Sequence, residues 1–270
     1  MVASSAEFVV SLTVLLFGAA CSILTVERLY FLRHHGFWYF ANSVLSQQEI
    51  ARGEADRYWK TRRFLLFTKL SAGMLCMAFA FSPSLAAPVL GIAVVVLFWD
   101  RRLEFLGGDG ADQKLRVVGT ILFATLICSR FDERCLPAGL ALVSMHLTFA
   151  YSAAGLAKLR SPAWRLGDSI RNIASSTAFG QGRALQFLSS RLAWCQVISI
   201  CVIAFEAAFP LFFLSRSLLV VGLCLAFCFH LANSMLLGLN SFLWVFPISY
   251  PAALYTQSNF TFSNDFLSAL

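Results

Sequence analysis

Long apolar stretches dominate this chain of 270 residues and limit what it can fold into. An apolar run of about 20 residues can cross the hydrocarbon core of a bilayer as a helix. The runs lie at residues 8–26, 64–81, 85–99, 116–128, 136–157, 194–214, 217–238 and 242–256. Hydrophobic residues make up 59% of the chain and charged residues only 13%, whereas soluble domains are about a quarter charged. We therefore predict a polytopic integral membrane protein with about eight transmembrane helices, within a range of seven to nine.

The spans are predicted to form an all-α bundle. Only helices and closed barrels satisfy the backbone in lipid, and the apolar runs lack the two-residue alternation of a barrel. We see no internal repeat or linker, so residues 1–270 are predicted to form a single transmembrane domain. Segments 36–62 and 158–191 mix aromatic and charged residues, which is typical of helices that lie in the membrane interface.

The basic residues are unevenly distributed. Segments 27–63, 100–116 and 158–191 carry all but four of the 21 Lys and Arg residues. Alternating spans place these segments on one side, the cytoplasmic side by the positive-inside rule, and the N-terminus outside. The net charge of +7 is then a feature of a protein whose partner is the bilayer, and it does not indicate nucleic acid.

Eight cysteines are present, without a CxxC pair, and most lie in apolar runs where a thiol packs as a small apolar group. Cys128 and Cys135 differ because they flank the short predicted outer loop 129–134. Two interpretations stay open: a disulfide, if that side is oxidising, or two thiols at helix ends. We predict no metal site.

Lys158 closes the apolar run that contains Tyr151 and Gly155. These residues stand at i, i+4 and i+7, so they share one helix face, with Lys158 about 10 Å along from Tyr151. A lysine in a partly apolar site can act as a base. The alternative is that Lys158 extends into the headgroups, as we expect for Lys69.

Three further polar residues are predicted near the middle depth of their spans: His146, Glu206 and His230. Asn233 follows His230 at i+3 on the same face. Such groups are costly in lipid, so they indicate a proton relay, a ligand site or contacts that hold helices together. The loop Gly107–Gly110 holds Asp109, which is predicted either to bind a cation or substrate amine or to cap a tight turn.

The chain resembles the horizontally transferred transmembrane (HTTM) domain family, relatives of the vitamin K-dependent gamma-carboxylase. The resemblance covers about 100–250 and rests on four motifs. They are Gly-Gly-Asp-Gly at 107–110, Tyr-x-x-Ala-Gly-x-x-Lys-Leu at 151–159 with Trp164 and Gly167, Glu206 with Pro210, and His-x-x-Asn-Ser at 230–234.

The resemblance implies a role for each matching residue. In the carboxylase the lysine of the second motif is held to be the base that deprotonates reduced vitamin K, and it matches Lys158. A catalytic role is thus implied for Lys158, with His230 beside it, and a reduced quinone as cofactor. The expected substrate contacts are Tyr151, Glu206, Asn233, His146, Trp164 and Asp109. The implied location is a bacterial inner membrane, crossed several times.

Two functions stay open. The first is an enzyme that acts on a lipid-soluble quinone or on a lipid-like or peptide substrate, with Lys158 as base. The second is a non-enzymatic accessory or immunity-type component of a secreted peptide or transport system, in which the same polar groups hold the helices together.

Overall fold

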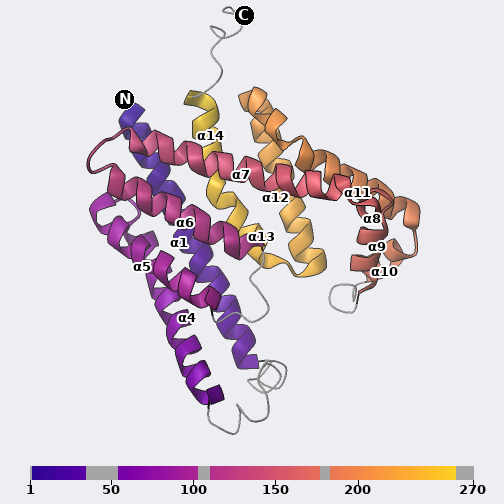
Figure 1. The fold of residues 1–270 in the computed structure, drawn as a ribbon, viewed down its shortest axis with the longest axis horizontal. Coiled ribbons are helices and arrows are strands. Elements are labelled where there is room, and N and C mark those ends of the chain that lie inside the picture. Colours follow the sequence, from indigo (N-terminus) through magenta and orange to yellow (C-terminus); the bar gives the residue numbers. More distant parts are fainter. Residues whose placement is uncertain (1, 35–53, 103–109, 177–182, 260–270) are drawn as a thin grey trace, which may run out of the picture. The chain divides into compact units, whose positions relative to one another are not determined.

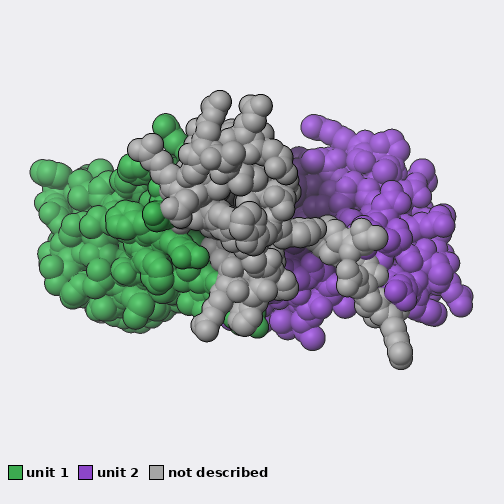
Figure 2. Space-filling view, turned by 90° about the horizontal axis from the view of Figure 1, so that it is seen from below, with its two compact units in different colours: residues 1–140 green, residues 141–270 purple. Residues whose placement is uncertain are grey.

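The computed structural model describes residues 2–34, 54–102, 110–176 and 183–259 (Figure 1). These residues are almost entirely helical and contain no strand, which confirms the predicted all-α class. The chain divides into two compact units, 1–140 and 141–270, coloured green and purple in Figure 2.

Unit 1 is a bundle of antiparallel helices. Its helices are α1 (Val2–His34), α4 (Glu54–Phe79), α5 (Pro83–Arg102), α6 (Gly110–Cys128) and the first turns of α7 (Cys135–Arg160). The chain packs α1 on α4, α4 on α5 and α5 on α6, and α6 returns to α1. Each of these four helices contributes a fully buried side chain to the core: Phe17, Leu66, Leu90 and Leu115.

A cluster of charged side chains joins the four helices of unit 1. Arg28 donates to Asp100 at 3.0 Å and to both carboxylate oxygens of Asp112 at 2.8 and 2.7 Å. Arg62 donates to the other oxygen of Asp100. The cluster connects the last turns of α1 and α5 with the first turns of α4 and α6. It thus brings together segments 27–63 and 100–116, which the charge pattern assigned to one side.

Lys69 belongs to this cluster, so the expectation that it extends into the headgroups is wrong. Its side chain is only 1% exposed, and its Nζ lies 3.6 Å from Asp100 Oδ2. The carboxylate on α5 offers the ammonium a partner inside the bundle, which a sequence taken one span at a time does not reveal. Asp100 therefore interacts with three cations: Arg28, Arg62 and Lys69.

Unit 2 begins with the remainder of α7. The elements that follow are α8 (Pro162–Arg165), α9 (Asp168–Ser175), α10 (Arg183–Ser189), α11 (Leu192–Ala207), η1 (Phe209–Leu214), α12 (Arg216–Leu237), α13 (Asn240–Val245), η2 (Phe246–Ser249) and α14 (Tyr250–Asn259). The short helices α8, α9 and α10 pack against α11, while η1, α13 and α14 pack against α12. Helices α8, α9 and α10 fall within segment 158–191, where interfacial helices were predicted.

Prolines modify two of the predicted spans. The run 194–214 is not one helix: α11 ends at Ala207, and the 3₁₀ segment η1 contains Pro210. The run 242–256 is helical throughout but passes through the 3₁₀ segment η2 at Pro247. Proline lacks an N–H and clashes with the preceding turn, so it ends or tightens a helix at these positions.

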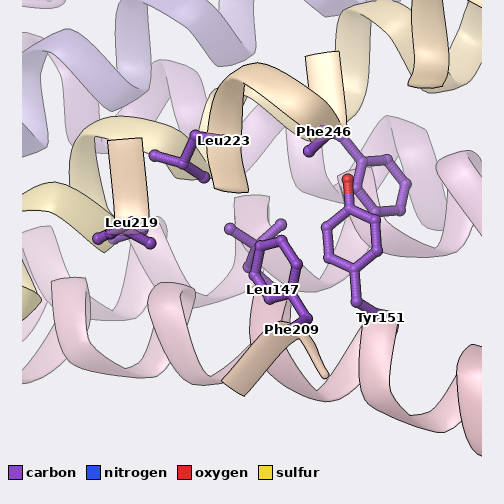
Figure 3. Packing of buried hydrophobic residues seen from close by; sticks show 8 residues of the cluster. Leu147, Tyr151, Phe209, Leu219, Leu223 and Phe246 are labelled. Atoms are coloured by element: carbon purple, nitrogen blue, oxygen red, sulfur yellow. The ribbon is translucent and has the colours of Figure 1, made fainter. Parts of the chain in front are cut away.

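Aromatic side chains form the core of unit 2. Tyr151 stacks on Phe209 with ring centroids 4.2 Å apart and meets Phe246 edge to face at 5.2 Å. Leu219 and Leu223 of α12 extend the same cluster (Figure 3). These contacts hold the face of α7 that carries Tyr151 against the core of unit 2.

Four helical segments of the described residues are long and apolar enough to cross a membrane: Ser5–Tyr30, Pro83–Arg102, Cys135–Arg160 and Arg216–Leu237. Large apolar side chains remain exposed on them, for example Val95 and Phe149. The other four predicted spans fall on helical segments that do not meet the same criteria, so the count of eight stays a prediction.

We expect Asp100→Asn to lower the stability of the protein, because three cations would lose their shared charge partner. Removing one member of a buried ion cluster costs about 3–5 kcal/mol. Thermal unfolding of the purified protein in detergent measures this. The exposed Asp132→Asn serves as control and should stay within about 0.5 kcal/mol of the parent. Equal effects of the two variants would show that the cluster does not stabilise the fold.

Candidate functional site

A cavity of about 410 Å³ lies within unit 2. Its walls come from α7, α11, α12 and α13, and from the short helices α8, α9 and α10. Most lining side chains are apolar, and the polar groups among them are few: Tyr151, Lys158, Glu206, His230 and Asn233, with the indole of Trp164. Size and lining resemble those of small-molecule sites, which are mostly apolar with a few placed polar groups.

Lys158 and Glu206 form an ion pair at this cavity. Lys158 Nζ donates to Glu206 Oε2 at 2.5 Å. The glutamate side chain is 5% exposed and the lysine side chain 20%. The ammonium also lies over the ring of Trp164, 5.1 Å from its centroid, a cation–π distance. Lys158 is therefore held from two sides, by charge and by an aromatic face.

Gly155 lets α7 and α11 approach closely enough for this pair to form. A Cβ at Gly155 would overlap the backbone of Glu206 and Ala207. Any larger side chain would push the two helices apart one turn from Lys158. The small residue in the middle of the motif is thus explained by the helix contact.

A second polar pair lies deeper in the unit. Tyr151 Oη and His230 Nε2 share a hydrogen bond of 2.7 Å that joins α7 to α12. Both residues are buried, at 2% exposure each. The imidazole ring lies 4.3 Å from the ring of Phe246, and Phe242 stacks at 6.0 Å. The pair therefore places a phenol and an imidazole in aromatic surroundings.

The short helices after α7 hold Trp164 in place. Ser199 Oγ of α11 donates to the carbonyl of Trp164 at 2.5 Å. Gly167 adopts a φ of 85°, which glycine accepts readily, and lies against the backbone of Gln196. This turn directs α9 back along α11, so that Ile170 and Ile173 line the cavity.

Most predicted site residues meet at one place. Tyr151, Lys158, Trp164, Glu206, His230 and Asn233 all line the cavity. Their functional roles stay predictions. His146 is not among the lining residues; it precedes Tyr151 by five residues, about 140° around the helix, so it lies on another face. Asp109 lies outside the described residues.

Cys128 and Cys135 are both free thiols in this structure. They lie at the end of α6 and the start of α7, as the flanking positions of loop 129–134 suggested. Whether they pair under oxidising conditions stays a prediction.

Apolar parts of the cavity wall were not anticipated. Ile173, Leu185 and Leu188 come from α9 and α10 and cover the cavity. The signal was the apolar pair Ile170 and Ile173 at i, i+3 in a polar stretch, which is typical of an amphipathic helix. Phe242 and Phe246 were also missed, because aromatic residues are frequent throughout the chain.

Residues 131–257 match the family model of the HTTM domain. The match covers slightly less than half of the chain, and residues 131–257, called the HTTM segment below, are similar to the HTTM domain. The match contains every described residue that lines the cavity. No curated protein and no solved structure matches the chain. The HTTM match and the long apolar helices together indicate a membrane protein.

We expect Gly155→Ala to destabilise the HTTM segment. In an ordinary helix this change is favourable by about 0.5–1 kcal/mol, but here the new methyl group meets the backbone of α11. Overpacking of this kind costs about 1–3 kcal/mol, so Gly155→Ala should lower the free energy of unfolding, where the same change in an ordinary helix would raise it.

Thermal unfolding measures the effect, with Ala157→Leu as control because Ala157 is exposed on the same helix. A higher melting temperature for Gly155→Ala would contradict the close packing of α7 on α11.

Proposed function

We propose that the HTTM segment is a membrane enzyme that binds an amphiphilic molecule with an acidic O–H group and uses Lys158 as base. One observation carries the proposal: an amine, a carboxylate, a phenol and an imidazole line one otherwise apolar cavity. Polar groups of this kind are costly in apolar surroundings and most often mark function.

The lining suits a lipid-soluble quinone in its reduced form. Trp164, Phe229, Phe242 and Phe246 offer aromatic faces, and most of the other lining side chains are aliphatic. The apolar walls would hold the ring and tail, while Lys158 and Asn233 would contact the oxygens. A reduced quinone supplies a weakly acidic phenolic O–H.

Proton movement within the pair explains how Lys158 can serve as a base. Transfer of one ammonium proton to Glu206 leaves a neutral amine and a neutral carboxylic acid. Neutral groups suit an apolar cavity better than separated charges do. The amine can then take a proton from a bound O–H group, which leaves an ammonium beside the oxygen and one proton stored on Glu206.

Tyr151 and His230 would serve the same cavity as a hydrogen-bonded couple. The imidazole can receive or return a proton at Nε2, through the hydroxyl of Tyr151. The surrounding phenylalanine rings keep water away from this couple. Lys158 and His230 are thereby proposed as the catalytic residues, and Tyr151 as the residue that positions the imidazole.

The resemblance to the gamma-carboxylase supports the same assignment, since the lysine of its matching motif is the base. We infer a multi-pass protein of a bacterial inner membrane from that resemblance and the charge pattern. Carboxylation itself is not part of the proposal.

A specific observation also favours the non-enzymatic function. Both polar pairs join different helices: Lys158 links α7 to α11, and Tyr151 links α7 to α12. A protein that needs only a stable bundle, as an accessory or immunity-type component does, would use them in the same way.

The first test identifies the ligand. Mass spectrometry of organic extracts of the purified protein should find a quinone or other amphiphile. Ala154→Leu, which narrows the cavity, should reduce its amount at least tenfold, while the exposed Ala157→Leu should not. Equal amounts in both variants would mean that the compound is bound elsewhere.

The second test separates the two functions by combining Lys158→Met with Glu206→Gln. Each single change leaves a buried charge without its partner and should lower stability by about 3 kcal/mol or more. The double variant should recover most of the stability. In a strain that depends on the protein, it should still fail to convert the ligand if Lys158 is a base. Full biological function of the double variant would favour the non-enzymatic role.

A further inference from the structure

We propose that unit 1 has a binding site of its own, for a small zwitterionic ligand of the amino-acid class. The site is a cavity of about 360 Å³ formed by the first turns of α1, the start of α5, the end of α6 and the turn that follows it. Its polar lining residues are Glu7, Ser11, Ser84, Ser129, Arg130 and Glu133. The proposal is independent of the function proposed for unit 2.

The charged side chains at this cavity, Glu7, Arg130 and Glu133, are exposed and do not pair with one another. Within the described part of the chain, neither Glu7 nor Glu133 forms an ion pair with Arg130 or with any other cation. Arg130 is held instead by the carbonyl of Ser84, to which its Nη2 donates at 3.3 Å. Two carboxylates and one guanidinium thus share a cavity without neutralising each other directly.

Ser11 is the second, independent observation. Serine and threonine inside a helix commonly donate to the carbonyl four residues earlier, and Thr13, Ser22 and Thr25 of α1 all do so. Ser11 is only 5% exposed and lines the cavity. Its hydroxyl has no hydrogen bond to any residue that the structure describes. The hydroxyl oxygen is accessible from the cavity, where a ligand can donate a hydrogen bond to it or accept one from it.

The chemistry of the lining selects the ligand class. An ammonium group fits between the carboxylates of Glu7 and Glu133, while a carboxylate fits the fork of Arg130. A bare cation would meet the guanidinium, and a bare anion would meet two glutamates. Val10, Leu126 and Leu136 supply an apolar floor for a side chain. The volume lies within the range of small-molecule sites.

The predicted topology places the turn 129–134 on the outer side of the membrane. A ligand would therefore reach this cavity from the outer side of the membrane.

Binding of the twenty free L-amino acids to the purified full-length protein tests the proposal, first by thermal shift and then by titration calorimetry. At least one amino acid should bind with a Kd in the millimolar range or below. Its amide, which lacks the carboxylate, and its deaminated acid, which lacks the ammonium, should each bind at least tenfold more weakly. The proposal is overturned if no amino acid binds, or if either analogue binds equally well.

Variants locate the binding. Glu7→Gln and Arg130→Gln should each raise the Kd at least tenfold. Asp132→Asn and Arg134→Gln change the same charges on the same turn, do not line the cavity, and should leave the Kd unchanged. The double variant Lys158→Met with Glu206→Gln, which is expected to keep most of the stability, should also bind normally, which separates this site from that of unit 2. Equal affinities for all variants would place the ligand elsewhere and refute the site.

Discussion

The ion pair between Lys158 and Glu206 is the contact on which the arrangement of unit 2 depends. Each of the two charges would be costly alone in apolar surroundings. Their meeting requires α7 and α11 to approach closely, and Gly155 makes that approach sterically possible. The pair also positions one wall of the cavity. The ammonium of Lys158 lies over the ring of Trp164, and this contact holds α8 and the following helix α9 beside the cavity.

Unit 1 meets the same constraint in a different way. There a single carboxylate, that of Asp100, is shared by three cations from α1 and α4, and Asp112 completes the neutralisation of Arg28. Such a cluster leaves each charge with a partner but offers little freedom to move a proton or admit a ligand. The simple pair at the cavity of unit 2 has fewer partners, which suits it better to chemistry.

The sequence predicts the helices and the polar residues of the cavity, for the same physical reason. Long apolar runs are helical because lipid leaves the backbone no other choice, and Lys158, Glu206 and His230 are conspicuous because they interrupt such runs. Pairing across helices is not visible in one span at a time, which explains why Lys69 was misjudged and why Asp100 drew no attention. His146 shows a related limit, since depth alone does not say which face a residue occupies. The apolar wall residues Leu185 and Leu188 are indistinguishable in sequence from ordinary packing residues.

The end of α11 has a consequence for how the residues at positions 158 and 206 can vary. Because the helix ends at Ala207, Glu206 sits at the negative end of the helix dipole, where an anion is disfavoured. Lys158 offsets both that penalty and the loss of hydration. We therefore expect positions 158 and 206 to be retained or replaced together, because the buried acid without the lysine is unfavourable.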